Sequence, residues 1–256
     1  MVIKSIKKMS SGKYQIIFDN NNKLITYDEV LLKNNLLYKK ELTTEEINEI
    51  NKANGYYNVY SSITKFVTKK MRSMKEVTEY LDKFGLSIKE KDNLINTLKE
   101  NGSINDNRFI KAFISDRLYL SNDGPYKIKN DLLKYNLNED DIDAEIANIN
   151  EEDILAKLTK LVNKKIKNSK GSQFSIKQKI YYDMSNLGYS KDMIDTIFTL
   201  DLDDSSSLEK DFNKAYRDII KKEKDNNKVY LKLKQKLYQK GYSLDKIEKI
   251  INEKRY

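Results

Sequence analysis

The chain has 256 residues, of which 39% are hydrophobic and 34% are charged, and its formal net charge is +9. This composition is less apolar and more charged than that of most compact globular domains, and it predicts several slim units with small cores. The chain contains neither cysteine nor histidine, which excludes disulfides, Ser-His-Asp and Cys-His catalysis, and the usual zinc sites. We therefore expect a protein that is not an enzyme.

The sequence begins MVIKSIKKMSSGKYQ and lacks the apolar core of a signal peptide. No apolar run along the chain is long enough to cross a bilayer. These two features predict a cytoplasmic protein without a membrane partner. The positive net charge favours a polyanion or an acidic protein groove as the partner.

Residues 1–42 differ from the rest of the chain. Three short runs, VIKSIKKM, KYQIIFD and KLITY, have the composition of strands. The stretch 20–22 is three asparagines, which is typical of a turn because asparagine tolerates positive φ. A short helix is predicted in YDEVLLKNNL. We expect a β-hairpin or three-stranded module that packs on the next part of the chain, because an isolated hairpin is only marginally stable.

From residue 43 to the end the pattern is helical, and it repeats. The four stretches align on a glycine or asparagine, with anchors 51, 52 and 53 residues apart: Gly85, Asn136, Gly188 and Gly241. Aliphatic residues stand eight and four positions before every anchor, as on one face of a helix. The anchor itself accepts the left-handed conformation that ends a helix. Two positions later stands a residue that can cap the next helix: Ser87, Asn138, Ser190 or Ser243.

This repeat predicts a mainly α fold of tandem three-helix repeats that form an elongated curved array, with a small β-rich module at the N-terminus. The expected segments are the N-terminal module and four repeats, at 1–42, 43–105, 106–149, 150–202 and 203–256. Pro125 is the only proline. We expect it at the first position of a helix, after Asp123 and Gly124, where its missing N–H is not needed.

Two stretches carry family signatures. The first reads RSMKEVTEYLDKFG and the second runs from Asp106 to Leu132. They resemble, in order, the two signatures of RecX regulatory proteins, and the matching positions are Arg72, Ser73, Glu76, Val77, Leu81 and Gly85, then Asp106, Arg108, Phe109, Arg117, Gly124, Pro125, Ile128 and Leu132. The chain departs from the family pattern at Ser103, Ile110 and Asn136, where an aromatic residue, alanine and glycine are usual.

The resemblance implies a modulator of the RecA recombinase. RecX proteins bind the RecA nucleoprotein filament and mainly inhibit its growth, ATP hydrolysis and strand exchange, in recombination, DNA repair and the SOS response. Some also bind single- or double-stranded DNA. The family uses no cofactor and no metal, and we expect a monomer. The alternative is a stand-alone basic helical-repeat protein that binds DNA without a recombinase partner.

Two basic segments are candidates for binding the partner or DNA. The first contains no acidic residue and supplies Lys65, Lys69, Lys70, Arg72 and Lys75. The second, residues 157–179, also lacks acidic residues, and helical spacing places four of its lysines on one face: Lys157, Lys160, Lys164 and Lys167. Lys170 follows in the same segment, and Leu158, Leu161 and Val162 are expected to face the core. Such a row suits phosphates, although it could also be a solvated helix face.

Arg108 and Arg117 complete the candidate set because they match the family signature. Each arginine could bind a carboxylate of the recombinase or a phosphate of DNA. Each, like Arg72, could instead hold adjacent helices together through an internal ion pair. Glu76 is one turn from Arg72, and Asp123 is close to Arg117 in the sequence.

Overall fold

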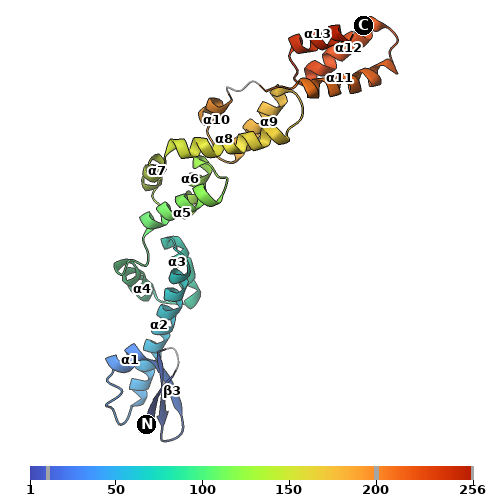
Figure 1. Ribbon diagram of the computed structural model, residues 1–256. Helices are drawn as coiled ribbons and strands as arrows, with labels where there is room; N and C mark the ends of the chain where they lie inside the picture. The colour runs from blue at the N-terminus through green and yellow to red at the C-terminus, as the bar shows by residue number, and fades with distance from the viewer. Residues whose placement is uncertain (10–11, 199–201, 255–256) are drawn as a thin grey trace. The chain divides into compact units, whose positions relative to one another are not determined.

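The computed structural model describes residues 1–9, 12–198 and 202–254. The fold is mainly α with a small N-terminal antiparallel sheet, as predicted (Figure 1). The chain divides into two compact units, Met1–Phe109 and Ile110–Tyr256. Within the described residues, every helix is too short or too polar to cross a membrane. The division into five segments stays a prediction, and residues 199–201, near the end of the expected third repeat, lie outside the described residues.

The first unit begins with a three-stranded sheet in the order β1-β2-β3, with β1 at Ile3–Lys8, β2 at Lys13–Phe18 and β3 at Lys23–Tyr27. Asn21 has a φ of 63° in the turn between β2 and β3, as its position predicted. The short helix α1 (Asp28–Lys33) covers one face of the sheet. There Ile16 and Phe18 pack against Leu31, so the strands and the helix share one core.

The long helix α2 (Thr44–Lys69) continues the first unit and contributes to two cores. Ile50, near its start, packs with the sheet, whereas Ile63 packs with the next helices of the unit. These are α3 (Met74–Leu81), the 3-10 turn η1 (Asp82–Phe84) and α4 (Ile88–Glu100). A capping box begins each of the three α-helices, with the pairs Thr43–Glu46, Ser73–Glu76 and Ser87–Glu90.

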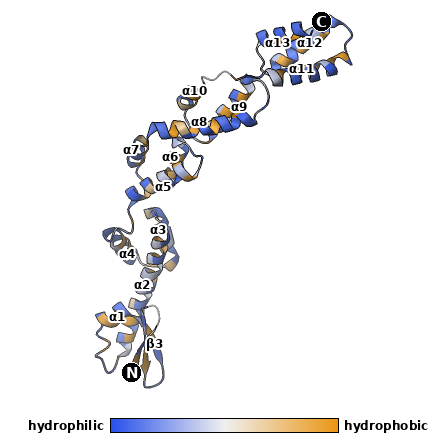
Figure 2. Cartoon of the chain, viewed as in Figure 1, coloured by the Kyte–Doolittle hydropathy of each residue, from blue (hydrophilic) through white to orange (hydrophobic). Residues whose placement is uncertain are grey.

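The helix α5 (Asp106–Leu120) begins at the end of the first unit. The remaining helices belong to the second unit and are α6 (Pro125–Leu133), α7 (Glu139–Ala147), α8 (Glu151–Asn168), α9 (Gln173–Asn186), α10 (Lys191–Ile197), α11 (Ser205–Ile220), α12 (Asn226–Gln239) and α13 (Leu244–Glu253). Figure 2 shows hydrophobic and hydrophilic residues interleaved along α8, as expected for a helix with one buried face.

The structure confirms the core that the repeat pattern predicts. The eight aliphatic residues placed eight and four positions before the anchors all have 0% exposure: Val77, Leu81, Ile128, Leu132, Ile180, Met184, Leu233 and Leu237. Three of the four repeats also bury an isoleucine six positions after the anchor, namely Ile142, Ile194 and Ile247. Lys91 takes this place in the first repeat, where it is only half-buried and its ammonium pairs with Asp82.

Consecutive repeats in the second unit meet through their middle helices. Pro125 is the first residue of α6, as predicted. The N–H of Gly124, just before it, donates to the Leu187 carbonyl at 2.6 Å, and the Tyr126 N–H donates to the Gly188 carbonyl at 3.0 Å. The start of α6 is therefore bonded to the end of α9. At the next joint the Ser172 hydroxyl, before α9, donates to the Lys240 carbonyl at the end of α12 at 2.6 Å.

Candidate nucleic-acid and partner interface

The first basic segment spans the end of α2 and the start of α3. Lys65, Lys69 and Lys70 are exposed, and the Lys70 ammonium lies 3.8 Å from the Glu76 carboxylate. Lys75 is half-buried and lies 4.0 Å from Glu79. The structure thus brings these lysines together around one helix junction, and their contact with a partner stays a prediction.

Arg72, at the same junction, is held internally. Its Nη1 donates to Glu76 Oε1 at 2.8 Å, and its Cζ lies 4.0 Å from the centre of the Phe66 ring. Only 17% of the side chain is exposed. Phe66 in turn stacks on Tyr80. This arrangement matches the internal ion pair expected as the alternative to a partner contact, because it fastens the last turn of α2 to α3.

The exposed Arg108 lies in the first turn of α5 and forms no ion pair within the described part of the chain. The neighbouring Asp106 has a clear structural role, since its carboxylate accepts from the Met74 N–H at 2.8 Å. That bond satisfies a free N–H at the start of α3. Of the three arginines that match the signature, Arg108 is the one whose guanidinium is most available to a partner.

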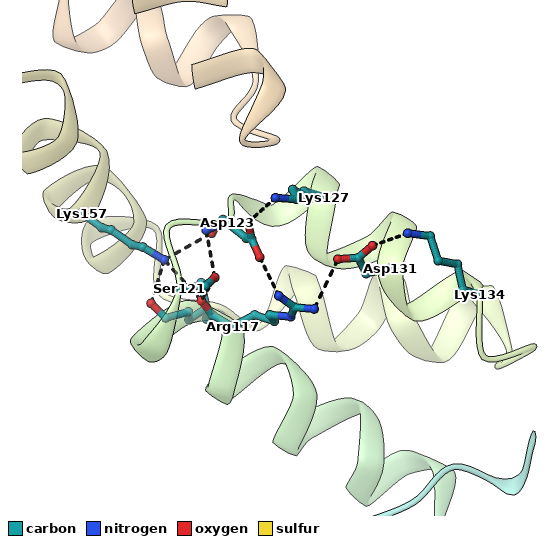
Figure 3. A network of polar contacts seen from close by, with 8 residues as sticks. Arg117, Ser121, Asp123, Lys127, Asp131, Lys134 and Lys157 are labelled. Atoms are coloured by element: carbon teal, nitrogen blue, oxygen red, sulfur yellow. Dashed lines mark hydrogen bonds and ion pairs between the residues drawn. The ribbon is translucent and has the colours of Figure 1, made fainter. Parts of the chain in front are cut away.

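Arg117 lies at the centre of a polar network at the end of α5 (Figure 3). Its Nη1 lies 3.1 Å from Asp123 Oδ2, and its Nη2 lies 3.7 Å from Asp131 Oδ2. The other Asp123 oxygen accepts from Lys127 Nζ at 2.6 Å. Asp131 also pairs with Lys134 at 2.5 Å. The network joins the last turn of α5 to α6, so Arg117 has the internal role that was weighed against partner binding.

Asp123 is only 5% exposed, yet it stays ionised at neutral pH. Burial raises the pKa of its carboxyl, but hydrogen bonds from Lys127 and Ser121 and the charges of Lys127 and Arg117 outweigh burial. The net result is a pKa below the ordinary value. The buried carboxylate is therefore compensated by two cations.

The structure corrects the expectation for Lys157. Instead of facing solvent with the other lysines of α8, its ammonium donates to the Leu118 carbonyl at 2.8 Å and to the Asp123 carbonyl at 3.2 Å (Figure 3). Burial lowers the pKa of Lys157, and the nearby Asp123 charge opposes this effect. Lys157 thus satisfies the Leu118 carbonyl in the last turn of α5 and the Asp123 carbonyl in the loop before α6.

The other residues of α8 face the sides of the helix that their spacing predicts. Leu158 and Val162 are buried, and Leu161 packs against the same core. On the other side three lysines are exposed and form no ion pair within the described residues: Lys160, Lys164 and Lys167. Lys170, beyond the helix, is exposed as well. These exposed side chains offer positive charges suited to phosphates.

The structure also contains a second row of cations, on α11, that was not predicted from the sequence. It consists of Lys210, Lys214, Arg217 and Lys221, all exposed. Asp211 and Asp218 interrupt the row in the sequence, so it does not stand out as a segment free of acidic residues. The spacing of four, three and four residues was the available signal, since it places all four cations on one side of a helix.

Comparison with known proteins identifies relatives along nearly the whole chain, although no family model matches. The regulatory protein RecX of Lactobacillus gasseri is 28% identical over 259 residues, covering 98% of this chain and 95% of that protein. That of Listeria monocytogenes serotype 4a is 27% identical over 262 residues, covering 97% and 94%. That of Leuconostoc mesenteroides is 28% identical over 263 residues, covering 98% and 97%.

Two crystal structures share the fold. One, of a regulatory protein RecX, matches with a TM-score of 0.62 at 20% identity and covers 77% of this chain and 98% of its own. The other, of RecX from Lactobacillus salivarius, matches with a TM-score of 0.53 at 23% identity and covers 57% and 95%.

Proposed function

We propose that this chain, which is similar to RecX regulatory proteins along nearly its whole length, is a RecX-type regulator that binds the nucleoprotein filament of the RecA recombinase. In this proposal it mainly inhibits filament growth, ATP hydrolysis and strand exchange during recombination and DNA repair. It acts in the cytoplasm as a monomer and performs no catalysis of its own. The observation that carries the proposal is the likeness to RecX proteins over 98% of the chain.

The surface chemistry supports a charged filament as the partner. Lys160, Lys164 and Lys167 are exposed on α8 and lack ion pairs within the described residues. On α2, Lys65 and Lys69 are exposed as well. Recombinase and DNA in a nucleoprotein filament present carboxylates and phosphates side by side, and lysines bind both without a fixed geometry. These residues, with Lys70, Lys75, Arg108 and Lys170, are the proposed contacts.

The test is DNA-dependent ATP hydrolysis by the recombinase of the same organism, with this protein titrated in. We expect the rate to fall at substoichiometric protein, because one regulator bound to a filament affects many subunits. The triple variant Lys160→Glu, Lys164→Glu and Lys167→Glu should weaken the effect. A control that reverses three exposed lysines elsewhere, Lys33, Lys52 and Lys89, should not.

A second function is favoured by the unpaired cations themselves. A stand-alone DNA-binding protein needs only such a surface, and its affinity falls steeply with salt. An unchanged ATPase rate at excess protein, with DNA binding intact, would exclude the regulator and leave this alternative. Retained binding to filaments whose DNA is already covered would exclude the alternative.

A further inference from the structure

The outer face of α11 carries four cations in one row. Lys210, Lys214, Arg217 and Lys221 follow one another at four, three and four residues, opposite the buried Leu208, Phe212 and Ala215. With a rise of 1.5 Å per residue, the row extends over roughly 16 Å. The four side chains also line one shallow surface hollow, together with Asn213 and Asp218.

None of the four cations has an ion-pair partner within the described residues, because lysines in α12 or directly after α12 and α13 pair with the nearby carboxylates. Lys236 lies 3.7 Å from Asp218, and Lys254 lies 2.9 Å from Glu209. Asp211 accepts from the Tyr242 hydroxyl at 3.0 Å and also pairs with Lys240. The acids that interrupt the row in the sequence are therefore neutralised from the other side of the helix.

Helix stability accounts for only part of this row, because Arg217 and Lys221 lie at the C-terminal end of α11, where cations interact favourably with the helix dipole, whereas Lys210 and Lys214 lie further from that end. Like charges four residues apart destabilise a helix, and Lys210–Lys214 and Arg217–Lys221 are such pairs. Solubility does not require the charges to be aligned either, because exposed lysines are numerous along the whole chain. A polyanion laid along the helix would relieve the repulsion.

The α11 row occupies positions equivalent to those of the lysine row on α8, one repeat earlier. The 53-residue step between Gly188 and Gly241 places Lys157 in register with Lys210 and Lys164 in register with Arg217. The Lys157 ammonium donates to the Leu118 and Asp123 carbonyls, whereas the Lys210 side chain is exposed. The α11 row therefore keeps all four of its cations facing solvent, one more than the three on α8.

We propose that the outer face of α11 is a phosphate-binding surface for DNA, in addition to α8. A duplex carries one negative charge about every 1.7 Å along its axis, so the row can face several phosphates at once. Lysine and arginine at an exposed helix face contact the backbone without reading bases, so binding is independent of sequence. The surface acts without the recombinase and does not depend on filament binding.

The test is fluorescence anisotropy of a labelled oligonucleotide, single-stranded or annealed to its complement, with the full-length protein alone at several salt concentrations. The variant replaces all four residues: Lys210→Gln, Lys214→Gln, Arg217→Gln and Lys221→Gln. If every residue makes a phosphate contact, the slope of log K against log salt falls by about 3.6 for duplex and about 2.8 for single strands.

Two further variants make the result decisive. The first, Lys33→Gln, Lys52→Gln, Lys89→Gln and Lys99→Gln, changes the net charge equally at exposed positions of the first unit, and its slope should stay close to that of the unaltered protein. The second, Lys210→Arg, Lys214→Arg and Lys221→Arg, keeps the charges and should keep the slope, whether or not the glutamine variant folds well. An unchanged slope in the folded glutamine variant, a drop as large in the first-unit control, or a lost slope in the arginine variant would overturn the proposal. The filament proposal is unaffected by these outcomes, since no recombinase is present.

Discussion

Gly188 lies so close to Lys127 that a Cβ added to the glycine would come within 2.4 Å of the Lys127 backbone nitrogen. Gly188 also has a φ of 87°, in the left-handed region. The position thus needs glycine twice, once for its backbone conformation and once for the contact between α9 and α6.

We expect Gly188→Ala to lower the free energy of unfolding by about 2 kcal/mol or more, because the left-handed conformation and the steric contact both oppose a side chain. Urea unfolding followed by circular dichroism measures the change. The matched control is Gly55→Ala in the middle of α2, where nothing lies within 4 Å of the added carbon. This variant should gain roughly 0.5–1 kcal/mol from helix propensity. Equal stability of the two variants would contradict the close contact at Gly188.

Asp123 should make stability depend on pH in the acid range. Its pKa is lower in the folded chain than in the unfolded chain, so its contribution is complete above about pH 4 and is lost as the pH falls further. We expect Asp123→Asn to cost about 1–3 kcal/mol at pH 7, because Arg117 and Lys127 lose their charged partner. The variant should also show a shallower decrease in stability below pH 4.

The matched control for this titration is Asp116→Asn, at an exposed position of α5. This change should alter neither the stability at pH 7 nor its decrease in acid, because Asp116 lies outside the network. Stability curves that run parallel in acid for the Asp123→Asn variant and the unaltered protein would disprove the role of the network.

The structural role of Lys157 separates it from the other lysines of α8. We expect Lys157→Gln to lower the free energy of unfolding by about 1–2 kcal/mol, because the Leu118 and Asp123 carbonyls lose a charged donor. Its effect on DNA affinity should be small. Lys164→Gln should do the reverse, with unchanged stability and weaker DNA binding. Thermal unfolding and anisotropy titrations of both variants provide the comparison, and a large affinity loss for Lys157→Gln at full stability would restore the original expectation.

A substitution of Arg72 distinguishes its internal contacts with Glu76 and Phe66 from a contact with the filament or its DNA. Lysine retains the charge but loses the planar contact with Phe66 and the directed bond to Glu76. We therefore expect Arg72→Lys to destabilise the first unit by about 1 kcal/mol, with little effect on ATPase inhibition at temperatures where the chain is folded. Loss of inhibition with unaltered thermal stability would instead show that Arg72 contacts the filament or its DNA.

The parts of the fold that depend on nearby residues could be predicted from the sequence. Capping at Thr43 and Ser87, the start of α6 at Pro125 and the left-handed conformation of Asn136 all follow from local chemistry. The fate of Lys157 could not be predicted, because it depends on carbonyls 34 and 39 residues away. For the same reason the sequence does not predict that Asp211 pairs with Lys240 and Asp218 with Lys236, which leaves the cations of α11 without these partners.

The bonds between α6 and α9 involve main-chain atoms at both ends, so this joint specifies no particular side chain beyond the small residues that permit it. The next joint, between Ser172 and the Lys240 carbonyl, also ends on a main-chain acceptor. Because these hydrogen bonds use main-chain acceptors, substitutions of exposed side chains leave the contacts between successive repeats intact. Adding or deleting a repeat in this part of the chain would therefore be expected to succeed only as a whole module, cut so that each middle helix keeps its own N-terminal residues and the glycine or asparagine that follows it.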